Sequence, residues 1–264
     1  QRPSRMSDDP ENLAEGTLMS HLLELRDRLI RAVFAVLLAC IPCFIFANEL
    51  FTWVADPLVK QLPKGAVLQA TSVVGPFMTP FKLAFFVGLF LAMPYVLYQI
   101  WAFVAPGLYR QEKRFAMPLL VSSIVLFYAG ALFAYWAVFP IMFGFFAGTA
   151  PANVMFNPDI SQYLDFVLTI FFAFGLAFEV PVAVVLLAVT GMVSVDSLRA
   201  NRGYVAIGIA IVAAILTPPD GMTLIIMGIP MYLLYEGGLF MASLMLKSRR
   251  ADAAKREQDG EAEA

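Results

Sequence analysis

The clearest indication of the fold class comes from residues 163–193, YLDFVLTIFFAFGLAFEVPVAVVLLAVTGMV. It is a run of 31 residues that is almost entirely apolar, with Glu179 and Pro181 near its centre. A straight helix needs about 20 apolar residues to cross about 30 Å of hydrocarbon. The segment can therefore span a membrane, and its extra length requires a tilt, a bend or a projection beyond the bilayer. Its continuous apolar character excludes the alternating pattern of a membrane β-barrel.

Five further apolar segments flank this one and predict an all-α polytopic membrane protein with six transmembrane helices. They are Leu29–Ala47, Leu83–Val104, Met117–Phe139, Gly203–Leu216 and Met222–Leu246. Composition supports the same class, because 60% of the residues are hydrophobic and only 14% are charged, against about 25% in soluble domains. The segment before the last one has 14 residues, about 21 Å of helix, and a Pro- and Gly-rich turn at 217–221 follows it.

The pattern divides the chain into three parts. Residues 1–16 are expected to form a flexible tail, and residues 17–246 the membrane domain, which opens with a short amphipathic helix on the cytoplasmic side. Residues 247–264 mix basic and acidic side chains and are expected to form a disordered cytoplasmic tail. No cleavable signal peptide is expected, because a polar segment of nearly thirty residues precedes the first apolar run.

The distribution of Lys and Arg predicts the orientation. With six spans, the two termini and the connectors at 105–116 and 194–202 lie on one side, which then carries 15 of the 18 basic residues. The other side carries Lys60, Lys64 and Lys82. Basic residues accumulate on the cytoplasmic side of membrane proteins, so both termini are predicted to be cytoplasmic.

Several function classes are excluded by the composition. A net charge of −2 is not that of a nucleic-acid-binding protein. The two cysteines, Cys40 and Cys43, lie within an apolar run and are interpreted as small core residues without a redox role. His21 is the one histidine, and none of the common hydrolase or metalloprotease motifs is present. An enzyme and a bound cofactor are therefore not expected.

Three carboxylates are candidates for function. Glu24 lies on the polar face of the amphipathic helix, four residues before Arg28, and Glu112 is the single carboxylate of the connector after the second span. Each could receive a guanidinium as a bidentate partner, or could be a simple surface ion pair. Glu179 lies near the middle of its span, where a carboxyl usually marks a functional site, and Pro181 should bend the helix beside it. The structural alternative for Glu179 is a hydrogen bond to a neighbouring helix.

The sequence resembles the TatC family, the multispanning subunit of twin-arginine protein translocases. The motifs that carry the resemblance are residues 20–26 (SHLLELR), 57–58 (PL), 99–109 (QIWAFVAPGLY), 112–114 (EKR), 174–181 (FGLAFEVP) and 216–220 (LTPPD). They occur in the family's order, from about residue 18 to residue 240.

The resemblance implies roles for individual residues. Glu112 and Glu24 would be the carboxylates that recognise a signal peptide with paired arginines, with Arg26 and Phe103 beside them. Glu179 and Pro181 would lie on the concave face of a glove-like helix bundle and contact a partner. Pro57 and Asp220 would lie in outer loops that affect assembly.

The resemblance also implies a function. The chain would be the core receptor subunit of a machine in the bacterial inner membrane that exports folded precursor proteins, driven by the protonmotive force and without a cofactor. Its partners would be TatB-type and TatA-type single-span subunits, further copies of TatC, the precursors and membrane lipid, and not nucleic acid. The alternative is a proton-coupled transporter of small solutes that uses Glu179, with the bent fourth helix as its central element.

Overall fold

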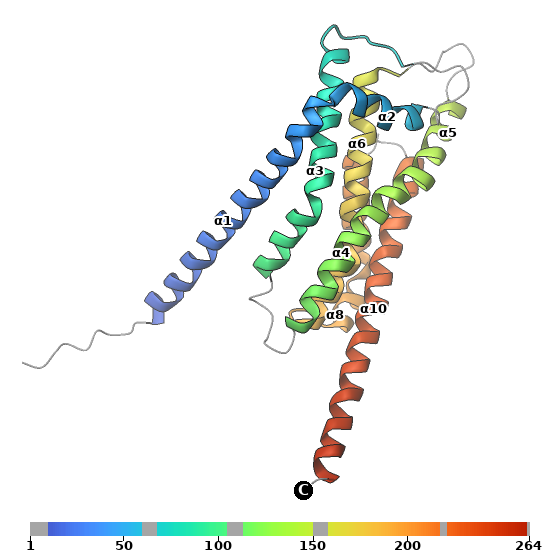
Figure 1. Cartoon of the computed structure of the whole chain (residues 1–264). Helices are drawn as coiled ribbons and strands as arrows, with labels where there is room; N and C mark the ends of the chain where they lie inside the picture. The colour runs from blue at the N-terminus through green and yellow to red at the C-terminus, as the bar shows by residue number, and fades with distance from the viewer. Residues whose placement is uncertain (1–9, 60–67, 105–112, 150–157, 217–220, 263–264) are drawn as a thin grey trace, which may run out of the picture.

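The protein is described by a computed structural model that covers residues 10–59, 68–104, 113–149, 158–216 and 221–262 (Figure 1). The helices are α1 (Pro10–Ile45), α2 (Ala47–Val59), α3 (Gly75–Val104), α4 (Lys113–Phe133), the π-helical turn η2 (Ala134–Val138), α5 (Phe139–Thr149), α6 (Ile160–Ala177), α7 (Val180–Val189), α8 (Val195–Ala200), α9 (Arg202–Leu216) and α10 (Gly221–Ala262). Within these ranges the β structure is limited to one isolated bridge between Gln69 and Asp159. The prediction of an all-α protein is confirmed.

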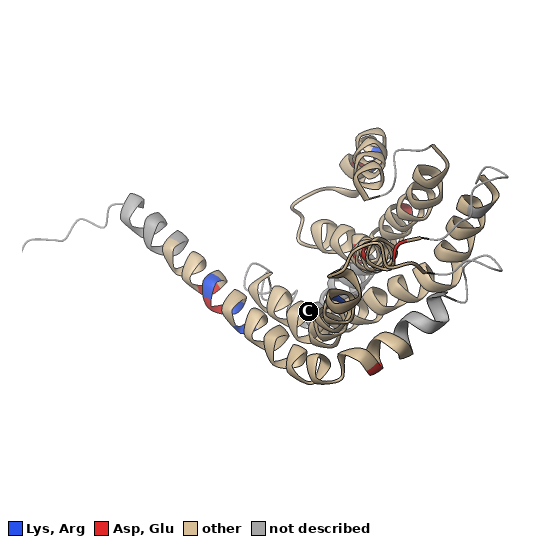
Figure 2. Cartoon of the chain, turned by 90° about the horizontal axis from the view of Figure 1, so that it is seen from above, with Lys and Arg blue, Asp and Glu red and all other residues tan. Residues whose placement is uncertain are grey.

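The predicted apolar segments all correspond to helices in the structure. Five helical segments are long and apolar enough to cross a membrane: Met19–Ile45, Gly75–Val104, Met117–Phe146, Ile160–Val189 and Gly221–Ser248. The short predicted span is α9, an apolar helix of 15 residues. Charged residues are sparse along the helices (Figure 2), as expected of a multi-pass membrane protein.

The first two predicted parts of the chain are joined more closely than expected. The tail at 1–16, the amphipathic helix and the first span were predicted as separate pieces, but α1 is one helix of 36 residues that begins at Pro10. Proline is well tolerated at the start of a helix, and no further proline follows until Pro42. The intervening Leu, Ala, Glu and Arg residues have high helix propensity, so the helix continues through the expected boundary.

The C-terminal tail also differs from the prediction. The segment 247–264 was expected to be disordered, whereas α10 continues as a helix to Ala262. In Figure 1 this part of α10 extends beyond the other helices of the bundle. Its residues are mainly Ala, Lys, Arg and Glu, which favour a helix when one has already been nucleated by the preceding span.

The fourth predicted span bends where the sequence indicated. Helix α6 ends at Ala177 and α7 begins at Val180, with Phe178 and Glu179 between them. Pro181 has no N–H to donate to the carbonyl of Ala177, which interrupts the regular hydrogen-bond pattern. The predicted bend at Glu179 and Pro181 is therefore confirmed.

The third span contains a feature that was not predicted. Between α4 and α5 the helix widens into the π-helical turn η2. Pro140 is the second residue after this turn, so the carbonyl four residues before it, that of Trp136, belongs to the turn. A proline ring clashes with the carbonyl four residues earlier in a regular α-helix, and a wider turn accommodates it.

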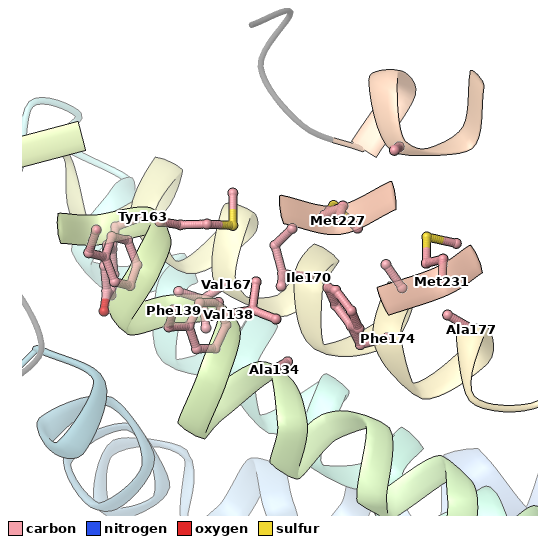
Figure 3. Close-up of a cluster of buried hydrophobic side chains, with 14 residues drawn as sticks. Ala134, Val138, Phe139, Tyr163, Val167, Ile170, Phe174, Ala177, Met227 and Met231 are labelled. Atoms are coloured by element: carbon pink, nitrogen blue, oxygen red, sulfur yellow. The ribbon is translucent and has the colours of Figure 1, made fainter. Parts of the chain in front are cut away.

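The main core lies where α4, η2, α5, α6, α9 and α10 meet. Phe139, Val167, Ile170, Phe174 and Met227 are fully buried there, and Figure 3 shows their side chains converging from different helices. A second cluster joins α7 to α10 and includes Trp101 of α3. The helices of the bundle thus hold each other by interdigitated aromatic and aliphatic side chains.

The two ends of the bundle are distinct (Figure 1). We call the end with the first residues of α1, the last residues of α3, and α8 the α8 end. The opposite end, with α2 and the first residues of α3 and α6, is the α2 end. At the α2 end, Gln69 exchanges backbone hydrogen bonds with Pro158 and Ile160 at 3.0 and 2.8 Å, which fastens the connector before α3 to the start of α6.

Cys40 and Cys43 are both buried and are free thiols. Cys40 lies against Gly88 of α3, where a Cβ atom would come within 2.6 Å of its sulfur. The interpretation of the two cysteines as small core residues is confirmed.

Candidate functional site

The first group of polar side chains lies at the α8 end, on α1. Glu24 Oε1 accepts two hydrogen bonds from Arg28, from Nε at 2.9 Å and from Nη2 at 2.6 Å. Arg28 Nη1 also reaches Oε1 of Gln99 on α3 at 3.5 Å. The predicted pairing of Glu24 with Arg28 is confirmed, and it is held between two helices rather than standing free in solvent.

Phe103 lies in the same group. Its ring stacks on the imidazole of His21, with 4.2 Å between centroids and 20° between planes. His21 Nδ1 in turn lies 3.9 Å from Glu24 Oε2. The structure thus brings Glu24 and Phe103, which are 79 positions apart in the sequence, to the two sides of one histidine.

Sequence reasoning missed His21 and Gln99 as members of this group. Nothing in the local sequence of His21 indicates a ring partner on α3. Gln99 is buried, an unusual position for an amide. We define Glu24, His21, Arg28, Gln99 and Phe103 as the α1–α3 polar group.

The other predicted recognition residues relate to this group in different ways. Arg26 binds the neighbouring Asp27 and not a member of the group, with hydrogen bonds from Nη2 and Nε to Oδ1 at 2.8 and 3.0 Å. Glu112 lies outside the described residues, in the connector between the end of α3 at Val104 and the start of α4 at Lys113.

The second group of polar side chains lies inside the bundle. Ser123 of α4 donates a hydrogen bond to Glu179 Oε2 at 2.6 Å and accepts one from Trp101 Nε1 at 3.0 Å. Glu179 Oε1 is buried and has no partner within the described part of the chain. The predicted alternative for Glu179, a hydrogen bond to a neighbouring helix, is therefore present, and half of the carboxyl group remains unsatisfied.

The two groups are connected through α3. Trp101 and Phe103 both lie in the last turn of that helix, one bonded to Ser123 and the other stacked on His21. A displacement of the end of α3 would therefore affect both groups.

The remaining predicted residues lie elsewhere. Pro57 is in helix α2, and Asp220 lies outside the described residues. Glu236 of α10 binds Arg202 Nη2 at 2.6 Å and accepts a hydrogen bond from Tyr232 at 3.1 Å. This ion pair joins α10 to α9.

Comparison with known proteins identifies the family. The family described as "Sec-independent protein translocase protein (TatC)" matches residues 20–230. This chain belongs to the TatC family. It is 52% identical over 249 residues to the TatC of Azotobacter chroococcum mcd 1, covering 94% of this chain and 97% of that one. It is 50% identical over 225 residues to the TatC of Escherichia coli strain K12, covering 85% and 87%.

A solved TatC structure has the same fold. A crystal structure of the twin-arginine translocase receptor TatC matches with a TM-score of 0.76 and 38% identity, covering 85% of this chain and 98% of that one. The resemblance inferred from the motifs is therefore correct. Membership of the TatC family supports the translocase interpretation over a proton-coupled solute transporter, and it identifies the chain as a component of a protein translocase.

Proposed function

We propose that this chain is the receptor subunit of a twin-arginine translocase and binds signal peptides that carry two adjacent arginines. The observation that carries the proposal is the α1–α3 polar group. It holds a carboxylate and a stacked aromatic pair beside the end of α3, where the connector with Glu112 begins. The solved relative that matches this fold is itself described as a twin-arginine translocase receptor.

The chemistry of the α1–α3 polar group suits a guanidinium. Both hydrogen bonds from Arg28 go to Oε1 of Glu24, and the nearby Oε2 faces His21 at 3.9 Å. An arginine of the peptide would bind Oε2, because a carboxylate can accept about four hydrogen bonds. Its planar group could also stack on the ring of Phe103. Glu112 would bind the second arginine, and Arg26 would border the site.

The proposal includes the environment of the protein. The α8 end would face the cytoplasm of a bacterium, with both termini inside and the chain in the inner membrane. Folded precursors would be exported with the protonmotive force as the energy source. The partners would be TatB-type and TatA-type single-span subunits and further TatC copies. Glu179 and Pro181 would contact such a partner, whereas Pro57 and Asp220 would support assembly at the α2 end.

Photocrosslinking from position 112 tests the receptor function. A photoreactive residue replaces Glu112, and a purified precursor with an Arg-Arg signal is compared with its Lys-Lys version in native membranes. Because that replacement removes one proposed carboxylate, the same comparison is made from position 103, with Glu112 intact. The proposal expects a crosslink with Arg-Arg that is lost with Lys-Lys. Equal crosslinking of the two signals, or none in correctly inserted protein, would contradict it.

Variants distinguish the role of the proposed peptide site from that of the buried group around Glu179. Glu112→Ala and Glu112→Gln should each weaken binding of the Arg-Arg signal without unfolding the protein. Glu179→Leu should reduce export and leave that binding intact, because the bond from Trp101 to Ser123, which holds the end of α3, remains in the variant. Normal export by Glu179→Leu would assign Glu179 to packing alone.

A further inference from the structure

The α2 half of the bundle contains an apolar groove that the proposed function does not use. Its volume is about 390 Å³, within the range of ligand sites in proteins. It lies between α3, α4 and α6, and the residues that form it include Leu83, Phe86, Phe90, Tyr128, Leu168 and Phe171. The hydroxyl of Tyr128 is bonded to the carbonyl of Phe90 at 2.7 Å, so this polar atom is already satisfied by the protein.

A charged pair lies at the α2 end of this groove. Lys82 Nζ binds both oxygens of Asp165, at 2.9 and 2.8 Å. Lys82 immediately precedes Leu83 of the groove, and Asp165 is one helical turn before Leu168. Both charged side chains are about half exposed, 49% and 53%, so each can bind a further group.

We propose that this groove and its charged pair form a binding site for one phospholipid with a primary-ammonium headgroup, the phosphatidylethanolamine class. One acyl chain lies in the groove. The phosphate accepts a hydrogen bond from Lys82, and the ammonium group donates to Asp165. A zwitterionic headgroup complements a Lys–Asp pair, because its ammonium group brings a positive charge to Asp165. An anionic headgroup such as phosphatidylglycerol offers Asp165 only neutral hydroxyl donors, which bind a carboxylate more weakly.

The dimensions of the groove favour an acyl chain. Along α3 it extends from Leu83 to Leu91, eight residues or about 12 Å of helix. One leaflet of the hydrocarbon core is about 15 Å thick. The charged pair therefore lies where the headgroup of a lipid in that leaflet would be, and the apolar groove lies where its chain would be.

The experiment uses the full chain purified from vesicles of defined composition. Vesicles contain phosphatidylglycerol together with either phosphatidylethanolamine or phosphatidylcholine, and retained lipid is counted by native mass spectrometry. Phosphatidylcholine has the same phosphate but no N–H donor for Asp165. We expect retention of phosphatidylethanolamine to be about fivefold greater than that of phosphatidylcholine. This ratio corresponds to the free energy of one partly exposed charged hydrogen bond. Equal retention of the two lipids would overturn the proposal.

Variants of the charged pair test the headgroup contact. Asp165→Asn should bring phosphatidylethanolamine down to the level of phosphatidylcholine, and Lys82→Gln should lower retention of both. The matched control is the exposed pair of Asp196 and Arg199 at the α8 end. Asp196→Asn should leave the lipid preference unchanged. A preference that survives in Asp165→Asn would overturn the assignment of the ammonium group.

A second measurement tests the groove first in the unaltered protein and then in a variant that fills it. Phosphatidylethanolamine with a diazirine in its acyl chain should label peptides of α3 and α6 that form the groove. Ala131→Phe, which places a ring in the groove, should abolish this labelling in protein that melts at an unchanged temperature. Labelling confined to other helices would overturn the proposal. So would the finding that a single-span peptide occupies the groove and prevents its labelling by the lipid.

Discussion

At the residue scale, Glu24 is held in place before any peptide arrives. Arg28 fixes Oε1, and His21 fixes the position of Phe103 beside it. A carboxylate oriented in this way loses little side-chain entropy when it binds a guanidinium. Arg28 offsets the charge of Glu24, but both of its bonds go to Oε1, so Oε2, which faces His21, can still accept a hydrogen bond.

Glu24→Gln should weaken binding of an Arg-Arg signal peptide by about tenfold, because a charged hydrogen bond becomes a neutral one. Titration of a labelled signal peptide against the purified protein measures the effect. The matched control is Asp27→Asn. Asp27 lies three residues after Glu24, and its carboxylate is bonded to Arg26. If the two variants lose affinity equally, general surface charge would account for binding, and the specific role of Glu24 would be wrong.

Ser123 supports the buried carboxyl of Glu179. Ser123→Ala should lower the free energy of unfolding by about 1–3 kcal/mol, because Glu179 Oε2 and Trp101 Nε1 both lose their partner. Thermal unfolding in detergent measures this. The double variant Ser123→Ala/Glu179→Leu should lose less free energy of unfolding than the sum of the losses in the two single variants. Strict additivity would show that the two side chains are not coupled.

Asp159 gives the protein a pH dependence at the α2 end. Hydrogen bonds from the side chain and backbone of Thr71, and from the backbone of Gln162 and Ser161, lower the pKa of Asp159 from 3.8 to about 2. The unfolded chain binds this proton more readily, so the stabilising contribution is complete above pH 4 and is lost as the pH falls through 2.

The melting temperature should therefore fall less steeply between pH 4 and pH 2 in Asp159→Asn than in the wild type. Asparagine can still cap α6, so the variant should fold. Parallel curves for the two proteins would show that Asp159 does not contribute to acid sensitivity.

At the scale of elements, the bend between α6 and α7 depends on a close approach to α10. A Cβ atom at Gly238 would lie 2.8 Å from Cα of Pro181, whereas one at the adjacent Gly237 would meet no atom within 4 Å. The two adjacent glycines thus have different roles, and only the packing of α7 on α10 distinguishes them.

Gly238→Ala should destabilise the protein by about 1–3 kcal/mol, because the backbone of α7 must move. The control, Gly237→Ala, should be neutral or stabilising by up to about 1 kcal/mol, since alanine favours the helix. Thermal unfolding compares the two variants. Equal effects would mean that α7 and α10 are not in the contact described.

At the scale of the whole molecule, the proposed orientation places the two ends of the bundle on opposite sides of the membrane. Val73 at the α2 end and Asp196 at the α8 end are both almost fully exposed. Each can therefore report on its side. The native Cys40 and Cys43 are buried and should not react.

A membrane-impermeant thiol reagent should label Val73→Cys from outside intact inner-membrane vesicles of right-side-out orientation. Asp196→Cys should be labelled only after the membrane is permeabilised. The reverse pattern would invert the topology and remove Glu24 from the cytoplasm, where a signal peptide must be read.

The class of the protein, its six apolar helices and their order could all be predicted from the sequence, because the hydrophobic runs and the proline near Glu179 act locally along the chain. It also indicated Glu24 with Arg28, since an i,i+4 pair depends only on helical spacing. It did not indicate that α1 begins at Pro10 or that α10 continues to Ala262, because polar composition does not prevent a helix from continuing out of a span.

Only the tertiary structure decided the contacts between helices. The stacking of His21 on Phe103, the bonds from Trp101 through Ser123 to Glu179, and the Lys82–Asp165 pair all join residues distant in sequence. Their positions depend on how α3 packs against α1, α4 and α6. That packing is set by small residues and ring shapes at many contacts together, such as Gly88 against Cys40, and no local pattern encodes it.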